Sequence, residues 1–198
     1  MLTRNYNMQQ PISTKNYYVE ISEEILLRAR SGQDTTSHRR QLFYISYSKI
    51  EKSLDTDALK KAFWINIYNA FYLIILRDRK NNGNIYGIKR IKVARSLLSL
   101  NDIEHGILRK TKFRWGLGYL TNPFYSKFIK SIAVHKVDYR IHFAIRSMNL
   151  NPASIDYFNS EEIEEQLSTV AADFIKLETE FKHSSKKLFY PNFCLPIC

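Results

Sequence analysis

This sequence of 198 residues has very little cysteine. Only Cys194 and Cys198 occur, both within the last five positions. A small secreted scaffold stapled by disulfides needs more cysteines, spread along the chain, so that class is excluded. No second Cys or His pair flanks these two to complete a zinc site. The fourth residue from the end is Leu195, which excludes a prenylation signal.

A long hydrophobic run is also missing. The longest apolar stretch, Ala62 to Leu76, would span about 22 Å as a helix, whereas the hydrocarbon core of a bilayer is about 30 Å thick. The stretch also contains two amides, Asn66 and Asn69. The sequence therefore predicts no transmembrane segment. It predicts a central helix that is buried on nearly all sides, with Asp55 or Thr56 capping its start.

The sequence lacks internal repeats and low-complexity tracts. Its opening segment from Met1 to Asn16 is polar, so we expect no signal peptide. We therefore expect a cytoplasmic location. The length fits one domain, and we expect a polar tail over residues 1–18 and a single domain over residues 19–198. Disordered chains have few aromatic residues, whereas this one has 13 Tyr, 12 Phe and 2 Trp, so most of it should pack.

Acidic residues are too few to balance the basic ones. The 30 Lys and Arg residues stand against 19 Asp and Glu residues, which gives a formal net charge of +11. A field of this sign favours anionic partners, such as nucleic acid, a phospholipid surface or an acidic protein. The alternative is a basic surface that serves only solubility, because net charge alone determines neither fold nor function.

Helix signals dominate the first half of the chain. A first helix is predicted from Ser22 to Gly32, because glycine is a common C-terminal stop. A second is predicted from Gln41 to Ser53. After the central helix, a further short helix should begin at Ser99, because Ser99 and Asp102 have the spacing of a reciprocal cap.

A long helix is predicted near the end of the chain, from Asn159 to Leu177. Asn159 and Glu162 have the spacing of a reciprocal cap, and Phe158 with Ile163 can form the hydrophobic staple next to it. Its apolar stripe is predicted to consist of Ile163, Leu167, Val170, Ala171 and Phe174.

Strict alternation predicts one strand, from Tyr139 to Ser147. Apolar residues and basic residues alternate there, with Ile141, Phe143 and Ile145 on one face and Arg140, His142 and Arg146 on the other. A turn is predicted from Asn149 to Ser154, and the terminal segment LFYPNFCLPIC is expected to add one short strand. Helices that come early and strands that come late favour an α+β fold, with a helix-rich N-terminal part and a small antiparallel sheet.

Three stretches together resemble one known family. The family's helix with a Trp-x-Asn-x-Tyr-Asn core resembles KAFWINIYNAFYLIIL, and its Ile-Glu-His helix resembles LSLNDIEHGILR. Its Asp-x-Arg-Ile-His-Phe-Ala strand resembles DYRIHFAIRS. In this order they identify the chain as similar to the domain of unknown function 547 family over about Asp55 to Phe181. That family has no settled activity, so the resemblance implies more about the fold than about the function.

The resemblance also implies a distant similarity to cysteine hydrolases of the papain and transglutaminase type. In the family's usual pattern the strand runs into Asn-Cys, and a second Cys precedes Pro-Pro. The corresponding residues here are Arg146-Ser147 and Asn151-Pro152-Ala153. Both cysteines are therefore replaced, and we expect the fold to be kept while the thiol chemistry is lost.

His105 is the candidate general base that the family pattern implies. Asp102, three residues earlier on an α-helix, is the candidate to orient its imidazole. Ser147 is the candidate nucleophile, and Asn66 the candidate to line a cleft beside His105. The structural alternatives are a stabilising helix-surface histidine, a serine that merely replaced a lost cysteine, and buried amides at Asn66 and Asn69 that tie their helix to loop backbone.

Cations and aromatic residues mix in the middle of the chain. The basic surface predicted there comprises Lys89, Arg90, Lys92, Arg95, Lys112 and Arg114, with Phe113 and Trp115 beside the last two. This mixture suits single-stranded nucleic acid, although no base-reading motif accompanies it. Acidic residues cluster instead in the late helix, between Glu161 and Glu165, and such asymmetry also suits self-association or an acidic protein partner.

Glu104, His105 and His142 have no diagnostic metal spacing, so neither a metal nor another cofactor is expected. The leading hypothesis is a non-catalytic binding or scaffold domain that meets an anionic partner, an acidic protein or nucleic acid, through its basic surface. One alternative is a hydrolase or acyl-transfer enzyme that uses His105 with Ser147 or an activated water. The other is a nucleic-acid-associated basic protein.

Overall fold

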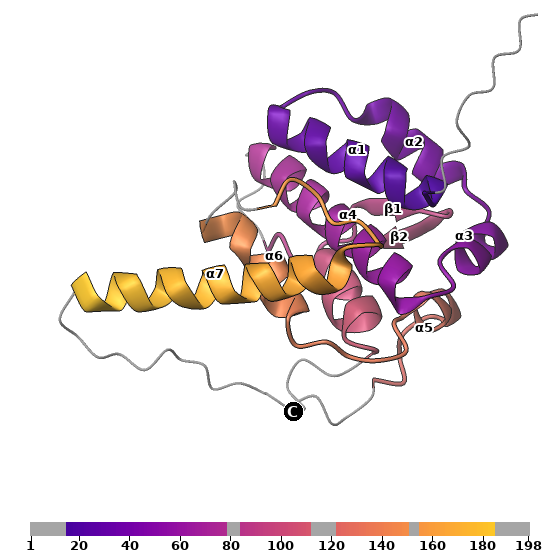
Figure 1. Ribbon diagram of the computed structural model, residues 1–198. Helices are drawn as coiled ribbons and strands as arrows, with labels where there is room; N and C mark the ends of the chain where they lie inside the picture. The colour runs from indigo at the N-terminus through magenta and orange to yellow at the C-terminus, as the bar shows by residue number, and fades with distance from the viewer. Residues whose placement is uncertain (1–14, 79–83, 112–121, 151–154, 185–198) are drawn as a thin grey trace, which may run out of the picture.

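The helix α4 (Asp57–Arg77) lies at the centre of the computed structural model, with α1 above it and α6 and α7 below it in Figure 1. Every residue from Ala62 to Phe71 is buried, as the sequence predicts. Thr56 caps the helix, since its Oγ1 accepts a hydrogen bond from the backbone N of Leu59 at 3.3 Å. Within the described ranges, no helix combines the length and the apolar character that a membrane crossing requires.

The structure describes residues 15–78, 84–111, 122–150 and 155–184, the side chains of 146–150 and 178–184 excepted. The elements besides α4 are, in chain order, α1 (Tyr17–Ser31), α2 (Thr36–Tyr44), α3 (Tyr47–Ser53), β1 (Ile91–Val93), β2 (Ser96–Leu98), the π-helix η1 (Asp102–Leu108), α5 (Lys127–Ile132), α6 (Ile141–Leu150) and α7 (Ile163–Ser184). The described chain is thus rich in helix, with a small antiparallel sheet of two strands, which confirms the predicted α+β class.

The first helix begins earlier than predicted, at Tyr17 rather than Ser22, and so within the segment expected to be a tail. Asn16 is the reason, because its side-chain oxygen caps the backbone N of Tyr18 at 3.0 Å while its amide nitrogen donates to the backbone O of Ser53 at 2.7 Å. The predicted stop at Gly32 is confirmed: its φ of 72° lies in the left-handed region that glycine tolerates.

The single helix predicted from Gln41 to Ser53 is wrong, because the chain forms α2 and α3 with a break at Ile45 and Ser46. In a continuous α-helix the carbonyls of Leu42 and Phe43 would accept from residues four positions later. They accept instead from the backbone N of Ala94 and of Arg95, each at 2.9 Å. A distant hairpin therefore ends α2.

That hairpin, β1 and β2, falls in a segment that the sequence presents as basic and irregular. Ile91 pairs with Leu98 and Val93 with Ser96, and the two-residue turn between them is Ala94-Arg95. Both turn residues have positive φ, 48° and 57°. Turns of this kind normally use Asn or Gly, so the sequence carries no signal for the hairpin.

The prediction of a strand from Tyr139 to Ser147 is wrong, because residues 141–147 belong to α6. Ile141, Ala144 and Ile145 are all buried, and their i, i+3, i+4 spacing is that of a helix face. Phe143 is buried too, which explains why the same residues also match a period of two. Of the turn predicted next, Asn149 and Leu150 belong to α6 and 151–154 lie outside the described residues, as does the terminal segment expected as a strand.

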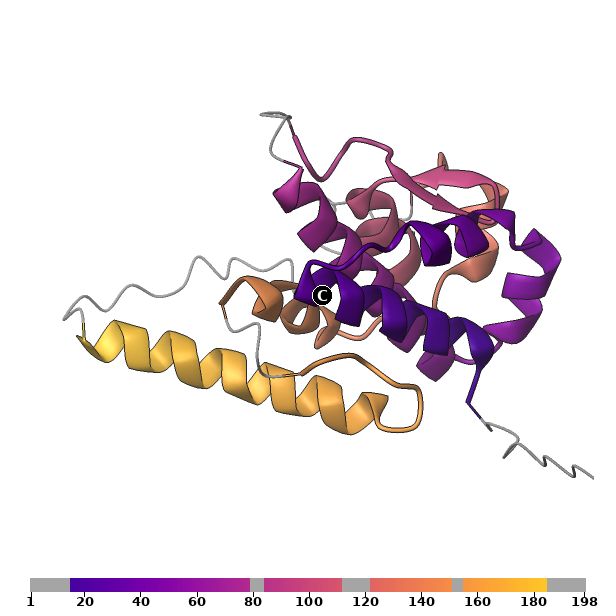
Figure 2. The same ribbon diagram turned by 90° about the horizontal axis from the view of Figure 1, so that it is seen from above.

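The late helix is confirmed, although α7 begins at Ile163 and the residues before it form its cap. Asn159 Oδ1 accepts from the backbone N of Glu162 at 2.8 Å, and its Nδ2 donates to the Glu162 carboxylate at 2.9 Å. The predicted stripe is buried throughout, at Ile163, Leu167, Val170, Ala171 and Phe174. It packs α7 against α6, on the opposite side of the molecule from the hairpin (Figure 2).

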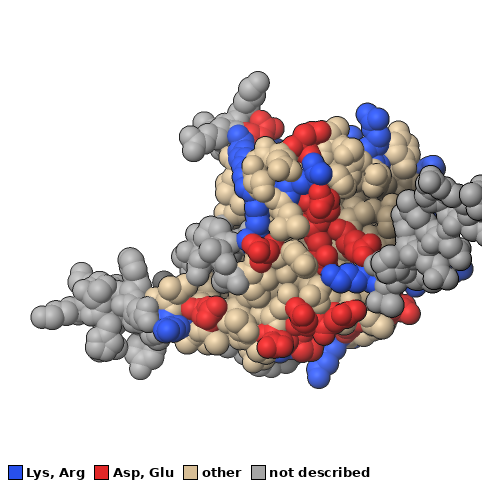
Figure 3. Space-filling model, turned by 45° about the horizontal axis from the view of Figure 1, so that its top comes forward, with Lys and Arg blue, Asp and Glu red and all other residues tan. Residues whose placement is uncertain are grey.

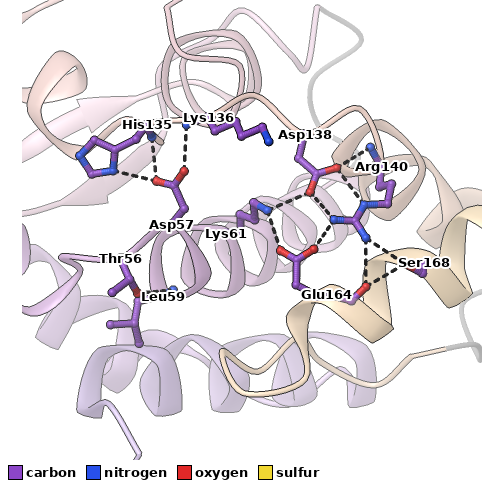
Figure 4. Close-up of polar contacts among 10 residues, drawn as sticks. All are labelled: Thr56, Asp57, Leu59, Lys61, His135, Lys136, Asp138, Arg140, Glu164 and Ser168. Carbon is purple, nitrogen blue, oxygen red and sulfur yellow. Dashed lines mark hydrogen bonds and ion pairs between the residues drawn. The ribbon is translucent and has the colours of Figure 1, made fainter.

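The first turns of α4 hold the connection between α5 and α6 (Figure 4). The Asp57 carboxylate accepts from the backbone N of His135 at 2.7 Å and of Lys136 at 2.8 Å. One turn on, Lys60 Nζ donates to the backbone O of Ala133 at 2.9 Å. Burial raises the pKa of Asp57, but hydrogen bonds from the two backbone N–H groups and from the His135 ring lower it by more, so the carboxylate stays charged.

A buried charge network continues this connection into α7. Lys61 Nζ lies 2.8 Å from the Asp138 carboxylate and 3.0 Å from Glu164 Oε1, and Arg140 contacts the same two acids. The side chains of Lys61 and Asp138 are each only 9% exposed. Burial raises the pKa of Asp138, but hydrogen bonds from Arg140 and Lys61 lower it by more, to well below its ordinary value of 3.8.

We expect Asp138→Asn to lower the free energy of unfolding by about 3 kcal/mol, because it leaves two cations without their buried carboxylate. The pKa of Asp138 is depressed in the folded state, so its stabilisation is complete above the unfolded pKa and is lost as the pH falls. The gap between wild type and variant in urea unfolding should therefore narrow below about pH 4.

The matched control is Asp156→Asn, which removes a carboxylate that is 77% exposed and 3.5 Å from Arg30. An exposed pair of this kind contributes less than about 1 kcal/mol. Equal losses in the two variants would contradict a special role for the buried network.

Candidate functional site

The candidate histidine lies on a π-helix, where the sequence predicted a short α-helix. Its backbone hydrogen bonds join residues five apart: the N of Arg109 donates to the O of Glu104 at 3.0 Å, and the N of Thr111 to the O of Gly106 at 2.8 Å. Most π-helices are single-turn bulges and occur frequently at functional sites. A π-helix of seven residues around His105 therefore makes this segment a candidate site.

The backbone is strained where η1 ends. Lys110 and Thr111 have φ values of 52° and 58°, in the left-handed region that a β-branched residue such as threonine rarely enters. Thr111 is buried, and its carbonyl accepts from the backbone N of Asn122 at 2.7 Å. Strained residues of this kind persist only where the surroundings hold them, and they cluster at active sites and ligand clamps.

Asp102 caps the start of η1 together with Ser99. Its Oδ2 accepts from the backbone N of Ser99 at 2.9 Å and from the Ser99 hydroxyl at 2.8 Å, while Ser99 Oγ accepts from the backbone N of Asp102 at 3.1 Å. The reciprocal cap predicted from the sequence is confirmed. The carboxylate is engaged by Ser99, so the role of Asp102 in orienting His105 stays a prediction.

His105 itself is buried, with 8% of its surface exposed. The next residue, Gly106, touches the segment before and within α5: a Cβ there would lie 2.8 Å from Ile129 Cγ2 and 3.0 Å from Tyr125 Cε1. Burial raises the pKa of the Tyr125 hydroxyl, and the charges of Asp102 and Glu104 raise it further. Tyr125 thus joins this site, although no motif in the sequence singles it out.

The other two candidate residues from the sequence are Asn66, which lies on α4, and Ser147, which lies on α6. Asn66 is fully buried, and its amide donates to the backbone O of Phe158 at 2.7 Å and to Ser22 Oγ at 3.2 Å, while its oxygen accepts from the backbone N of Phe158 at 2.8 Å. These contacts support the structural alternative for Asn66. Ser147 lies within α6 instead of at the end of a strand, and its side chain is outside the described residues.

Asn69 makes a similar tie, but to a helix. Its Nδ2 donates to the backbone O of Ala144 at 3.3 Å. Asn69 therefore joins α4 to α6, and not to loop backbone as expected.

In the sequence, Glu104, His105 and His142 are the residues considered as metal ligands, and their spacing is not diagnostic of a metal site. Among the residues that the structure describes, no group of three or more His, Cys, Asp or Glu side chains is arranged to hold a metal ion.

The described part of the basic surface lies on the hairpin and just before it. Lys92 is exposed and sits opposite Leu97 on the outward face of the two strands. Arg95 is exposed in the turn, and Lys89 and Arg90 precede β1. None of these four cations forms an ion pair within the ranges that the structure describes. Lys112 and Arg114 lie outside the described residues.

Acidic side chains gather elsewhere, along α7 at the lower edge of Figure 3. Glu161, Glu162 and Glu165 are exposed at the start of that helix, and Glu164 pairs with Lys61 and Arg140. The hairpin, which carries the exposed cations, and α7, which carries these acids, lie on opposite sides of the molecule (Figure 2).

A family model described as "Protein of unknown function, DUF547" matches residues 52–175. No curated protein matches the chain significantly, and neither does any solved structure.

We expect Gly106→Ala to lower the free energy of unfolding by roughly 1–3 kcal/mol, because the new methyl group would overlap Ile129 and Tyr125 in a packed region. Chemical unfolding measures this loss. Gly87→Ala is the matched control, since its methyl group would meet the flexible Asn84 side chain at 3.1 Å and should cost no more than about 0.5 kcal/mol. A wild-type stability for Gly106→Ala would show that η1 and α5 are not packed this closely.

Proposed function

The chain belongs to the family described as protein of unknown function, DUF547, and we propose that it is a non-catalytic member that binds an anionic partner through its basic surface. The family description assigns no activity, so the support comes from this chain's own charges.

The observation that carries the proposal is the contrast between two groups of cations. Lys61 and Arg140 are partly buried and share two carboxylates. Lys92 and Arg95 on the hairpin, with Lys89 and Arg90 beside them, form no ion pair within the described chain. Clustered like charges without counter-charges attract an anionic partner and accelerate its association.

The absence of thiol chemistry supports a binding role over catalysis. The chain has cysteine only at positions 194 and 198, and serine stands at position 147, where the family pattern has cysteine. A serine hydroxyl needs an adjacent base and an oxyanion site before it becomes a nucleophile, whereas a thiolate forms near neutral pH. The burial of His105 also limits its access to a substrate.

We expect the double variant Lys92→Glu and Arg95→Glu to elute from a heparin column at clearly lower salt than the wild type, because the attraction is electrostatic and concentrated on the hairpin. The control is Lys127→Glu with Lys136→Glu, which makes the same change in net charge at two exposed sites away from the hairpin. Equal shifts for both double variants would show a diffuse charge effect and contradict a localised binding surface.

A second candidate function is favoured by the strain around η1. His105 lies on the seven-residue π-helix, and the left-handed Lys110 and Thr111 follow where that helix ends; both features are frequent at functional sites. It supports a hydrolase or acyl-transfer enzyme in which His105 acts as general base on Ser147 or on a water molecule.

A fluorophosphonate probe separates the two candidates, because it reacts only with an activated serine. We expect no labelling of the wild type under conditions that label a control serine hydrolase. Labelling that disappears in both Ser147→Ala and His105→Gln, with thermal unfolding unchanged, would replace the binding proposal with the enzyme.

A further inference from the structure

We infer that the anionic partner of this basic surface is a single-stranded nucleic acid, and that it docks where the hairpin meets α2. The inference rests on the proposed function and names the partner's chemistry. The surface, called here the α2–hairpin patch, consists of Arg39, Arg40, Phe43, Tyr44, Lys92 and Arg95.

The patch is held rigid by backbone contacts between its two halves. The turn residues Ala94 and Arg95 donate their N–H groups to the last carbonyls of α2, those of Leu42 and Phe43, at 2.9 Å each. Helix ends need such partners for their unsatisfied carbonyls. The two left-handed turn residues are kept in place by the same bonds. A preformed surface loses little conformational freedom when a ligand docks.

Cations and aromatic rings lie next to one another in the patch. Lys92 Nζ lies 5.8 Å from the centre of the Phe43 ring, and that ring meets Tyr44 edge-on with centroids 5.0 Å apart. Both arrangements are within the usual range for cation–π and aromatic contacts. Lys92, Phe43 and Tyr44 therefore form one continuous row that runs from the hairpin onto α2.

The helix adds two further cations next to these rings. Arg39 and Phe43 are four residues apart on α2, as are Arg40 and Tyr44, so each arginine lies one helical turn from a ring. The guanidinium of Arg39 sits 5.3 Å from the centre of the Phe71 ring of α4, which fixes its position. In the described chain, neither arginine forms an ion pair.

Tyr44 is the feature that selects a single strand. Tyr44 is 63% exposed, although large aromatic residues usually bury most of their surface, and it shares the patch with four cations that form no ion pair among the described residues. Single-stranded nucleic acid offers phosphates to the cations and open base faces to a ring. A duplex keeps its base faces stacked inside, and an acidic peptide has no comparable planar groups along its length.

The decisive measurement is fluorescence anisotropy of the full chain with a labelled oligothymidylate of about twelve nucleotides, within the span that small single-strand sites cover. A duplex of the same length and a polyglutamate peptide are the competitors. Four phosphate contacts predict a slope of log K against log salt of about −3 for a single strand.

Three variants of the full chain test the stacking. Tyr44→Ala should weaken binding to the oligothymidylate roughly 5- to 100-fold, because one base loses its platform. Tyr44→Phe keeps the ring and should bind like the wild type. Tyr139→Ala, which removes a 73% exposed tyrosine outside the patch, should also bind like the wild type.

Other results overturn the inference in distinguishable ways. Equal affinity for the duplex, or a Tyr44→Ala variant that binds normally, would remove the stacking claim while leaving a basic binding surface. Preference for polyglutamate over the oligothymidylate would identify an acidic protein partner instead. Failure to bind any of the three probes, together with no retention on heparin, would defeat the proposed function itself.

Discussion

The amide of Asn66 lies fully buried in the middle of α4, where an unpaired polar group would be costly, and so it dictates what packs around it. It pairs with both backbone groups of Phe158 and with the hydroxyl of Ser22. One turn later Asn69 bonds to the backbone of α6. The central helix thereby fixes α1, α6 and the approach to α7 through polar contacts inside an apolar core.

Charged side chains in the first turns of α4 also hold its neighbours in place. Lys60 donates to the backbone O of Ala133. Asp57 accepts from the backbone N of His135 and of Lys136, and Lys61 brings Asp138 and Glu164 together (Figure 4). The side chains of Lys61 and Asp138 are largely excluded from water. Removing one member of the network therefore leaves a buried charge without its partner and destabilises the fold. The charges of this region are thus paired with one another. The cations on the hairpin and on α2 form no ion pair among the described residues.

Two regions therefore differ in character. Around His105 the backbone adopts an unusual helix and ends in two residues with left-handed φ values, yet the histidine is buried. At the α2–hairpin patch the backbone is braced and the side chains are exposed, charged and aromatic. The first has the unusual backbone that is frequent at functional sites, and the second presents exposed charges and aromatic rings.

The sequence by itself determined the central helix, which is buried from Ala62 to Phe71, the stop at Gly32 and the paired cap at Asn159, because each depends on residues close together in the chain. It also determined the family and the charge imbalance. The break after Tyr44, the hairpin at 91–98 and the helical form of Ile141–Leu150 were decided by tertiary structure. Carbonyls of α2 accept from a turn some fifty residues away, and a segment that fits two periods takes the one that buries Ala144 beside Asn69. Such choices depend on contacts between distant segments, and local pattern cannot contain them.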